Sequence, residues 1–297
     1  MVILADSAAL FEPAKADFVA DPQPDAAALR QFLVNVVNYA NGALHGLPNF
    51  VATRATNAFE DRPMEDVLES TGIVSYSYLP LHYVNRSSAR VAYRGGHEVL
   101  ETNGKDERKS SPSHGLQTAG EFGPFLSTVL ADAVKGKITW ARWERGIDSS
   151  NAVFHYEVSH GGSHYFVQFC CIREDSGESI ATHIYSEKTG YSGEIVFNPT
   201  TGAVTRISVQ AARTPGELVA SAGMVVEYAP VEVGQKTLVL PIKSVSILKA
   251  HTAAPPDGMH MAIFKGPAKT FLNDVVFENY HQYRGEMRMV SDGAAPQ

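Results

Sequence analysis

Tight-turn signals recur along most of this chain and constrain its fold more than any other feature. Two-residue signals separate β-prone segments at Gly95-Gly96, Asn103-Gly104 and Gly234-Gln235. Such pairs tolerate the positive φ that short hairpins require. A longer turn runs from Asn198 to Gly202, where Asn-Pro opens the turn and Gly202 takes the left-handed position. Strands joined this closely are antiparallel, so the spacing predicts an antiparallel sheet rather than βαβ units.

The β-prone segments between these turns number about twelve, more than a flat sheet holds before it curls. The turn 160–163 is expected to join segments 153–159 and 164–171 as a hairpin, and residues 61–88 to form an irregular excursion. The sequence therefore predicts a mainly β protein. Its core is a large curved antiparallel sheet, an incomplete barrel of about 11–12 strands, with two helices packed on or in its concave face.

Two segments have helical rather than β periodicity. Asp25 is a suitable N-cap for a helix whose apolar residues recur from Leu29 to Ala40 and which Asn41-Gly42 ends. The second helix begins at Pro124, a residue that the first helical position accepts. Because no Pro/Gly-rich linker interrupts the strands, we expect one β-rich domain over residues 25–285. A loose leader (1–24) precedes it and a flexible tail (286–297) follows it.

Strict alternation along a strand assigns side chains to faces. It places Phe154, Tyr156 and Val158 together, and likewise Phe271, Val275 and Phe277 on the last strand. It also predicts that Trp140 and Trp143 lie on opposite faces. The adjacent Cys170 and Cys171 would point apart, as two small hydrophobic side chains rather than a bonded pair.

The composition is that of a globular protein: 44% of residues are hydrophobic, 19% are charged and the formal net charge is −7. Nucleic-acid binding requires a basic face, and the chain has no Lys/Arg run longer than two residues. No uninterrupted apolar run approaches the ~20 residues of a transmembrane helix. The first residues lack the basic region of a signal peptide.

Linear catalytic motifs are absent: there is no G-x-S-x-G, P-loop or G-x-G-x-x-G pattern. His97-Glu98 begins like a zincin motif but lacks the second histidine. The eleven histidines, including His160 and His164 in one turn, are expected to be solvated or singly bonded rather than metal ligands. We therefore predict no catalytic residues, no metal site and no cofactor.

Several short motifs together resemble a large group of exported acidobacterial proteins of unknown function. They span about residues 25 to 285 and comprise Leu47-Pro48-Asn49-Phe50, Gly120-Glu121-Phe122-Gly123, Trp140 to Trp143, Gly193 to Gly202, Glu227-Tyr228-Ala229-Pro230-Val231, Leu240-Pro241-Ile242 and Phe277-Glu278-Asn279-Tyr280. The group is similar to the lipoprotein-carrier fold, an incomplete antiparallel barrel that wraps helices and shelters acyl chains. The resemblance implies a periplasmic or secreted protein and no catalytic residue.

The leading functional hypothesis is a non-enzymatic protein that binds a lipid or other amphiphilic ligand in the concave face of its sheet. The expected ligand-binding residues are apolar side chains of the second helix and of three strands: Phe125, Leu126, Val129, Leu130, Phe154, Tyr156, Phe169 and Phe277. The same residues would also serve a filled core. Two other classes stay open, a metal- or carboxylate-dependent hydrolase and a protein-interaction module of the cell envelope.

Overall fold

The structure is a computed structural model. It describes residues 17–62, 67–68, 74–75, 79–95, 97–102, 105–106, 115–116, 118, 120–147, 149–175, 180–214, 217–251, 253–254 and 268–282.

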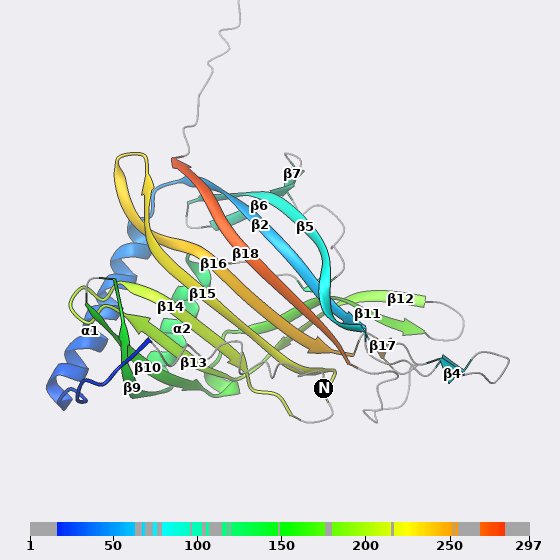
Figure 1. The fold of residues 1–297 in the computed structure, drawn as a ribbon, viewed down its shortest axis with the longest axis horizontal. Coiled ribbons are helices and arrows are strands. Elements are labelled where there is room, and N and C mark those ends of the chain that lie inside the picture. Colours follow the sequence, from blue (N-terminus) through cyan, green and yellow to red (C-terminus); the bar gives the residue numbers. More distant parts are fainter. Residues whose placement is uncertain are drawn as a thin grey trace, which may run out of the picture.

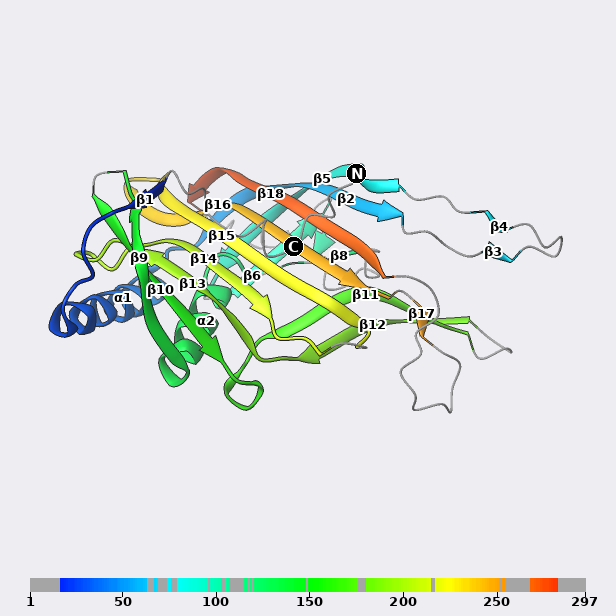
Figure 2. The same cartoon turned by 60° about the horizontal axis from the view of Figure 1, so that its bottom comes forward.

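A single large antiparallel sheet dominates the molecule, as the turn chemistry predicts. Its long strands run side by side across Figure 1, and the turned view shows the sheet curving around the helices (Figure 2). The sheet is open, because no pairing among the described residues joins its two edge strands to each other. Its twelve strands, in spatial order, are β1 (Phe18–Val19), β9 (Lys137–Arg145), β10 (Ser150–Val158), β13 (Tyr191–Phe197), β14 (Val204–Ala211), β15 (Val219–Val233), β16 (Lys236–Ala250), β18 (Lys269–Gln282), β2 (Phe50–Arg62), β5 (Leu79–Arg94), β6 (His97–Thr102) and β7 (Lys105–Asp106).

A smaller sheet lies against part of the large one. It is built on β11 (Phe166–Asp175), which pairs with β12 (Ile180–Lys188), with β8 (Gly115–Leu116) and, in parallel, with β17 (Ala253–Ala254). A third, minimal pair joins β3 (Val67–Leu68) to β4 (Val74–Ser75). The short 3₁₀ helix η3 (His160–Gly162) connects β10 to the start of β11.

Two α-helices are present within the described residues, and both begin as predicted. The helix α1 (Ala26–Gly46) is capped by the Asp25 carboxylate, which accepts hydrogen bonds from the amides of Ala27 and Ala28. The helix α2 (Pro124–Lys135) has proline at its first turn. The predicted end of α1 at Asn41-Gly42 is wrong, because the helix continues to Gly46 and stops before Pro48, whose ring restricts the preceding residue.

The two helices and the small sheet cover the same face of the large sheet, which we call the inner face. Alternate residues of β15 show this: Met224, Val226 and Tyr228 pack with the helices, whereas Ala222 packs with β11. The inner face therefore has two halves. The helix-covered half consists of β10, β13 and β14. The other half consists of β2, β16 and β18, and β11 of the small sheet covers it.

Four of the predicted turns join neighbouring strands. β5 pairs with β6 around Gly95-Gly96, β6 with β7 around Asn103-Gly104, β13 with β14 around 198–203, and β15 with β16 around Gly234-Gln235. Gly202 and Gly234 have φ of 74° and 67°, the left-handed values that favour glycine. The hairpin predicted from the same turn chemistry at 160–163 is wrong. These residues do make a turn, but β10 pairs with β9 and β13 while β11 belongs to the small sheet.

Part of the predicted irregular excursion is regular. β2 extends to Arg62, and β5 begins at Leu79 and pairs with β2 over most of its length. The rest of 61–88, apart from β3 and β4, lies outside the described residues, as does the tail 286–297. Within the predicted leader, Phe18 and Val19 pair with β9, and Pro22 accepts a hydrogen bond from the indole of Trp143.

Two β-bulges overturn two of the predictions made from strict alternation. The β9–β10 ladder shifts register between Val153 and Phe154, and the rings of Trp140 and Trp143 meet edge-to-face with centroids 5.0 Å apart. The prediction that they lie on opposite faces is therefore wrong. The ladder of β11 shifts between Cys170 and Ile172, and Cys170 is buried and disulfide-bonded. The expectation of an unbonded small hydrophobe is also wrong.

Candidate functional site

Polar side chains interrupt the inner face in the half of the sheet under β11. On β18, Asn273 lies between the buried Phe271 and Val275. On the neighbouring β16, Ser246 pairs directly with Asn273, and Ser244 follows on the same face. Arg54 on β2 lies next to this row. We call Arg54, Ser244, Ser246 and Asn273 the polar belt; all four are at most 9% exposed.

A cavity of about 670 Å³ lies between the polar belt, α2 and β11. We call it the large cavity. Its volume is in the range of sites that hold small molecules. Apolar walls come from Phe125, Met224, Leu248 and Phe271. The polar wall is formed by side chains of the belt and of neighbouring strands: Arg54, Thr56, Ser87, Ser88, Thr118, Gln168, Ser246 and Asn273. The two kinds of wall make the cavity amphiphilic.

Arg54 connects the large cavity to a buried carboxylate. Its guanidinium donates to Thr118 Oγ1 at 2.5 Å and lies 3.4 Å from Glu121 Oε1. Ser244 Oγ donates to the same carboxylate oxygen at 3.4 Å. Arg54 Nε, Glu121 Oε2 and the hydroxyl of Ser246 are buried without a partner among the described residues. Each buried polar atom without a partner costs about 1–3 kcal/mol of stability, so a ligand that bonded to these atoms would recover that cost.

A second carboxylate, Glu98, binds the backbone amides of the residues before and after Glu121. It accepts hydrogen bonds from the amides of Gly120 and Phe122 at 3.1 and 3.3 Å. Burial and the neighbouring charge of Glu121 raise the pKa of Glu98 to about 7, although these amides and Arg54 act in the opposite direction. When Glu98 is protonated, the net charge of Glu98, Glu121 and Arg54 together is therefore close to zero.

Motifs that are scattered along the sequence meet around Glu121 and Phe122. Phe122 contacts Phe50, Phe277 and Tyr280 edge-to-face, at centroid distances of 5.4, 5.0 and 6.0 Å. The hydroxyl of Tyr228 donates to Glu121 O at 3.4 Å, and the hydroxyl of Tyr280 donates to Pro241 O. These residues come from five of the motifs that carried the family resemblance, so the structure gives those motifs one shared location.

A histidine–carboxylate pair lies on the opposite side of the large cavity. Asp132 on α2 is 1% exposed, and its Oδ1 lies 2.6 Å from Nδ1 of His164. Its Oδ2 accepts from the His164 amide at 2.7 Å and from the hydroxyl of Tyr191 at 2.9 Å. Burial alone would raise the pKa of Asp132, but the hydrogen bonds from His164 and Tyr191 outweigh it and lower the pKa. His164 itself lines the cavity, and 69% of its side chain is exposed.

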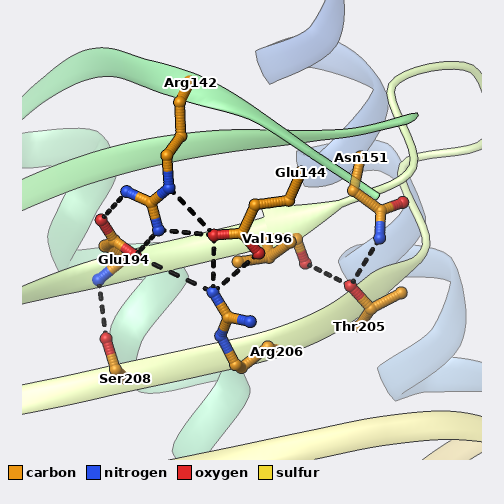
Figure 3. A network of polar contacts seen from close by, with 8 residues as sticks. All are labelled: Arg142, Glu144, Asn151, Glu194, Val196, Thr205, Arg206 and Ser208. Carbon is orange, nitrogen blue, oxygen red and sulfur yellow. Dashed lines mark hydrogen bonds and ion pairs between the residues drawn. The ribbon is translucent and has the colours of Figure 1, made fainter. Parts of the chain in front are cut away.

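A third charged cluster lies on the outer face and differs from the belt. Arg142 binds Glu194 through two nitrogens at 2.5 and 2.7 Å, and Arg206 binds both oxygens of Glu144 at 2.9 Å (Figure 3). Arg142 also binds Glu144, which links β9, β13 and β14. Two cations neutralise two anions, and none of the four side chains has a buried polar atom without a partner. This network is a structural tie.

A separate apolar cleft of about 450 Å³ lies between α1, α2 and inner-face side chains of β9, β10 and β13. Its walls are aliphatic or aromatic apart from Asn38 and Gly136, and no charged residue lines it. At its rim, Val34 and Val134 are 49% and 60% exposed. The cleft differs from the large cavity in having no polar wall.

The eight predicted ligand-binding residues are distributed over several sites. Phe125 lines the large cavity, and Leu130 and Phe154 line the apolar cleft. Leu126 borders a void of about 20 Å³. Val129, Tyr156, Phe169 and Phe277 are at most 4% exposed and pack in the hydrophobic clusters. The polar belt and the Glu98–Glu121 pair were not predicted from the sequence.

The histidines do not form a metal site within the described residues, where no group of three or more metal-ligating side chains occurs. His97 lies in β6, a strand, so the zincin-like dipeptide has the wrong backbone. No helix in the described part of the chain combines the length and the hydropathy of a membrane span.

Comparison with models of known protein families, with curated proteins and with solved structures found no match to this chain.

Proposed function

We propose that this protein binds a single-chain amphiphile in the large cavity. The observation that carries the proposal is an unfilled space of about 670 Å³ with one apolar and one polar wall. Ligand sites are concave and combine apolar walls with a few polar groups, and this space over the inner face of the sheet has both.

The walls indicate how such a ligand would lie. A hydrocarbon chain would contact Phe125, Met224, Leu248 and Phe271, which bury apolar surface. The polar group would meet the belt, where Arg54 Nε and the Ser246 hydroxyl have no partner among the described residues. Hydrogen bonds to those atoms would remove the cost of burying them unpaired.

Charge compensation around the cavity favours a neutral polar group or a single carboxylate over a multiply charged group. Arg54 already faces Glu121, and Glu60 at the cavity wall is paired with Lys269. A strongly anionic group would meet the Glu98 and Glu121 carboxylates behind Arg54. A periplasmic or secreted location, implied by the family resemblance, forms part of the same proposal.

Titration with dansyl-labelled undecanoic acid tests the binding, with a neutral monoacylglycerol as competitor. Ser246→Leu would fill part of the cavity and remove the belt hydroxyl, and we expect it to weaken binding at least tenfold. Ser192→Leu on β13, on the outer face, is the matched control and should bind like the unmodified protein. Absence of binding by the unmodified protein, or equal affinities in both variants, would contradict the proposal.

A further inference from the structure

The Asp132–His164 pair has the geometry of a general base aimed at the large cavity. A carboxylate only accepts hydrogen bonds, so His164 must donate its Nδ1 proton across the 2.6 Å contact with Asp132. The lone pair of the ring is then on Nε2. Within the described part of the chain no group bonds Nε2, and the ring lines the cavity.

Asp132 holds this arrangement firmly. Its two oxygens accept from the His164 ring, the His164 amide and the Tyr191 hydroxyl, which fixes both the ring orientation and the tautomer. A buried carboxylate also stabilises the imidazolium that forms when Nε2 takes a proton. Asp132 is a positioning residue in this arrangement, because only His164 faces the cavity.

Other histidines in this region lack these features. His160, four residues earlier in η3, is exposed and does not line the cavity. Nε2 of His155 lies 3.7 Å from Glu157, whose side chain is 53% exposed, and the ring does not line the cavity. A buried carboxylate, a fixed tautomer and a cavity coincide at His164.

We propose that the large cavity is a hydrolytic site for a neutral ester of a single-chain amphiphile, in which His164 acts as general base toward water. The inference rests on the proposed function, because the ester would occupy the amphiphile site. Nε2 takes a proton from water, and the water oxygen bonds to the ester carbonyl carbon. The bond from that carbon to the alkoxy oxygen then breaks, and the imidazolium gives its proton to the leaving oxygen. Ester and water thus become carboxylic acid and alcohol, with no redox change.

The lining favours an ester over more highly charged substrates. Arg54 is the only described lysine or arginine that lines the cavity, and it is paired with Glu121. The lining therefore offers no uncompensated lysine or arginine to a phosphate dianion. The acyl chain would lie on Phe125 and Phe271 of the apolar wall. His164 and residues of β11 line the same cavity.

Hydrolysis of p-nitrophenyl octanoate by the full chain tests the inference. We expect His164→Ala to lower the rate at least 100-fold, within the ~10²–10⁴-fold contribution of a general base. Added free imidazole should restore part of the rate in that variant alone. Asp132→Asn should lower the rate at least tenfold. His160→Ala is the matched control and should hydrolyse at the unmodified rate.

The outcomes separate catalysis from binding. Dansyl-undecanoate binding with no hydrolysis above buffer, or His164→Ala hydrolysing at the unmodified rate, overturns the catalytic inference and leaves the binding proposal intact. Hydrolysis without dansyl-undecanoate binding overturns the binding proposal. Because Asp132 keeps its hydrogen bonds to the His164 amide and the Tyr191 hydroxyl, His164→Ala should still fold, with a lower Tm, and a single cooperative unfolding transition verifies this.

Discussion

The two halves of the inner face are made from similar strands but are packed differently. Under the helices, Phe154, Tyr156, Ile195 and Phe197 follow one another on β10 and β13, and none is more than 3% exposed. Under β11, the polar belt interrupts the same alternation and the large cavity opens beside it. Both halves border open space, but its lining differs: the cleft beside Phe154, Ile195 and Phe197 is apolar, whereas the large cavity has a polar wall whose buried side chains need partners.

The packed half should not tolerate an added methyl group where strands approach closely. A Cβ on Gly193 would lie 1.9 Å from Ser208 O and 2.9 Å from the Tyr156 hydroxyl. We expect Gly193→Ala to lower the free energy of unfolding by about 3–5 kcal/mol, the size of the largest core effects. Denaturant titration measures it. Gly161→Ala, where a Cβ would meet nothing within 4 Å, should change stability by less than about 0.5 kcal/mol; equal effects would show that the packed half is not tight.

The same increase in volume should have opposite consequences in the two halves. Ala152 is 0% exposed in the helix-covered core, so Ala152→Leu should cost about 1–3 kcal/mol through overpacking. Ser246→Leu places similar volume in the large cavity and removes an unpaired hydroxyl, so it should be neutral or stabilising. Thermal unfolding of both variants compares them directly. A loss at Ser246 as large as that at Ala152 would mean that the belt half is filled.

Stability of the belt half should depend on pH through Glu98. Its pKa in the folded protein, about 7, lies above the usual value, so the folded state holds the proton more tightly than the unfolded chain. The associated stability is present below about pH 4.5 and is lost as the pH rises to about 7. Glu98→Gln should therefore match the unmodified protein at pH 4.5 and be more stable by about 1–2 kcal/mol at pH 8. Exposed Glu227→Gln serves as control, and a Tm advantage of Glu98→Gln that did not grow with pH would contradict this account.

The smallest expected effect concerns the tie between α1 and the packed half. Asn35 Nδ2 donates to Pro199 O at 2.8 Å, in the turn between β13 and β14. Asn35→Ala should cost about 1 kcal/mol, the value of one hydrogen bond. Urea unfolding would detect it, and Asn38→Ala at the rim of the apolar cleft is the comparison.

Much of the fold could be predicted from the sequence because turns and caps are local. Gly202 and Asp25 act on residues within a few positions, so their chemistry can be read directly. The turn at 160–163 shows the limit, since turn residues do not specify which sheet the next strand joins. The positions of β-bulges could not be predicted from the sequence either: one extra residue in β9 brings Trp140 and Trp143 to the same face.

The candidate site was less predictable, because it is assembled from distant strands. Arg54 and Glu121 are 67 residues apart, and Asp132 and His164 are 32 apart. One signal was present. Asn273 occupies the same face as Phe271 and Val275, and a polar residue at an inward position indicates a polar partner or a ligand.

A crystal structure of the protein with 10-bromodecanoic acid tests the central claim most directly, because bromine can be located by its anomalous scattering. The account predicts a bromine peak in the large cavity, near Phe125 and Phe271, with the carboxyl group at the polar belt. A peak in the apolar cleft between Val34 and Val134, or no bound molecule, would contradict it.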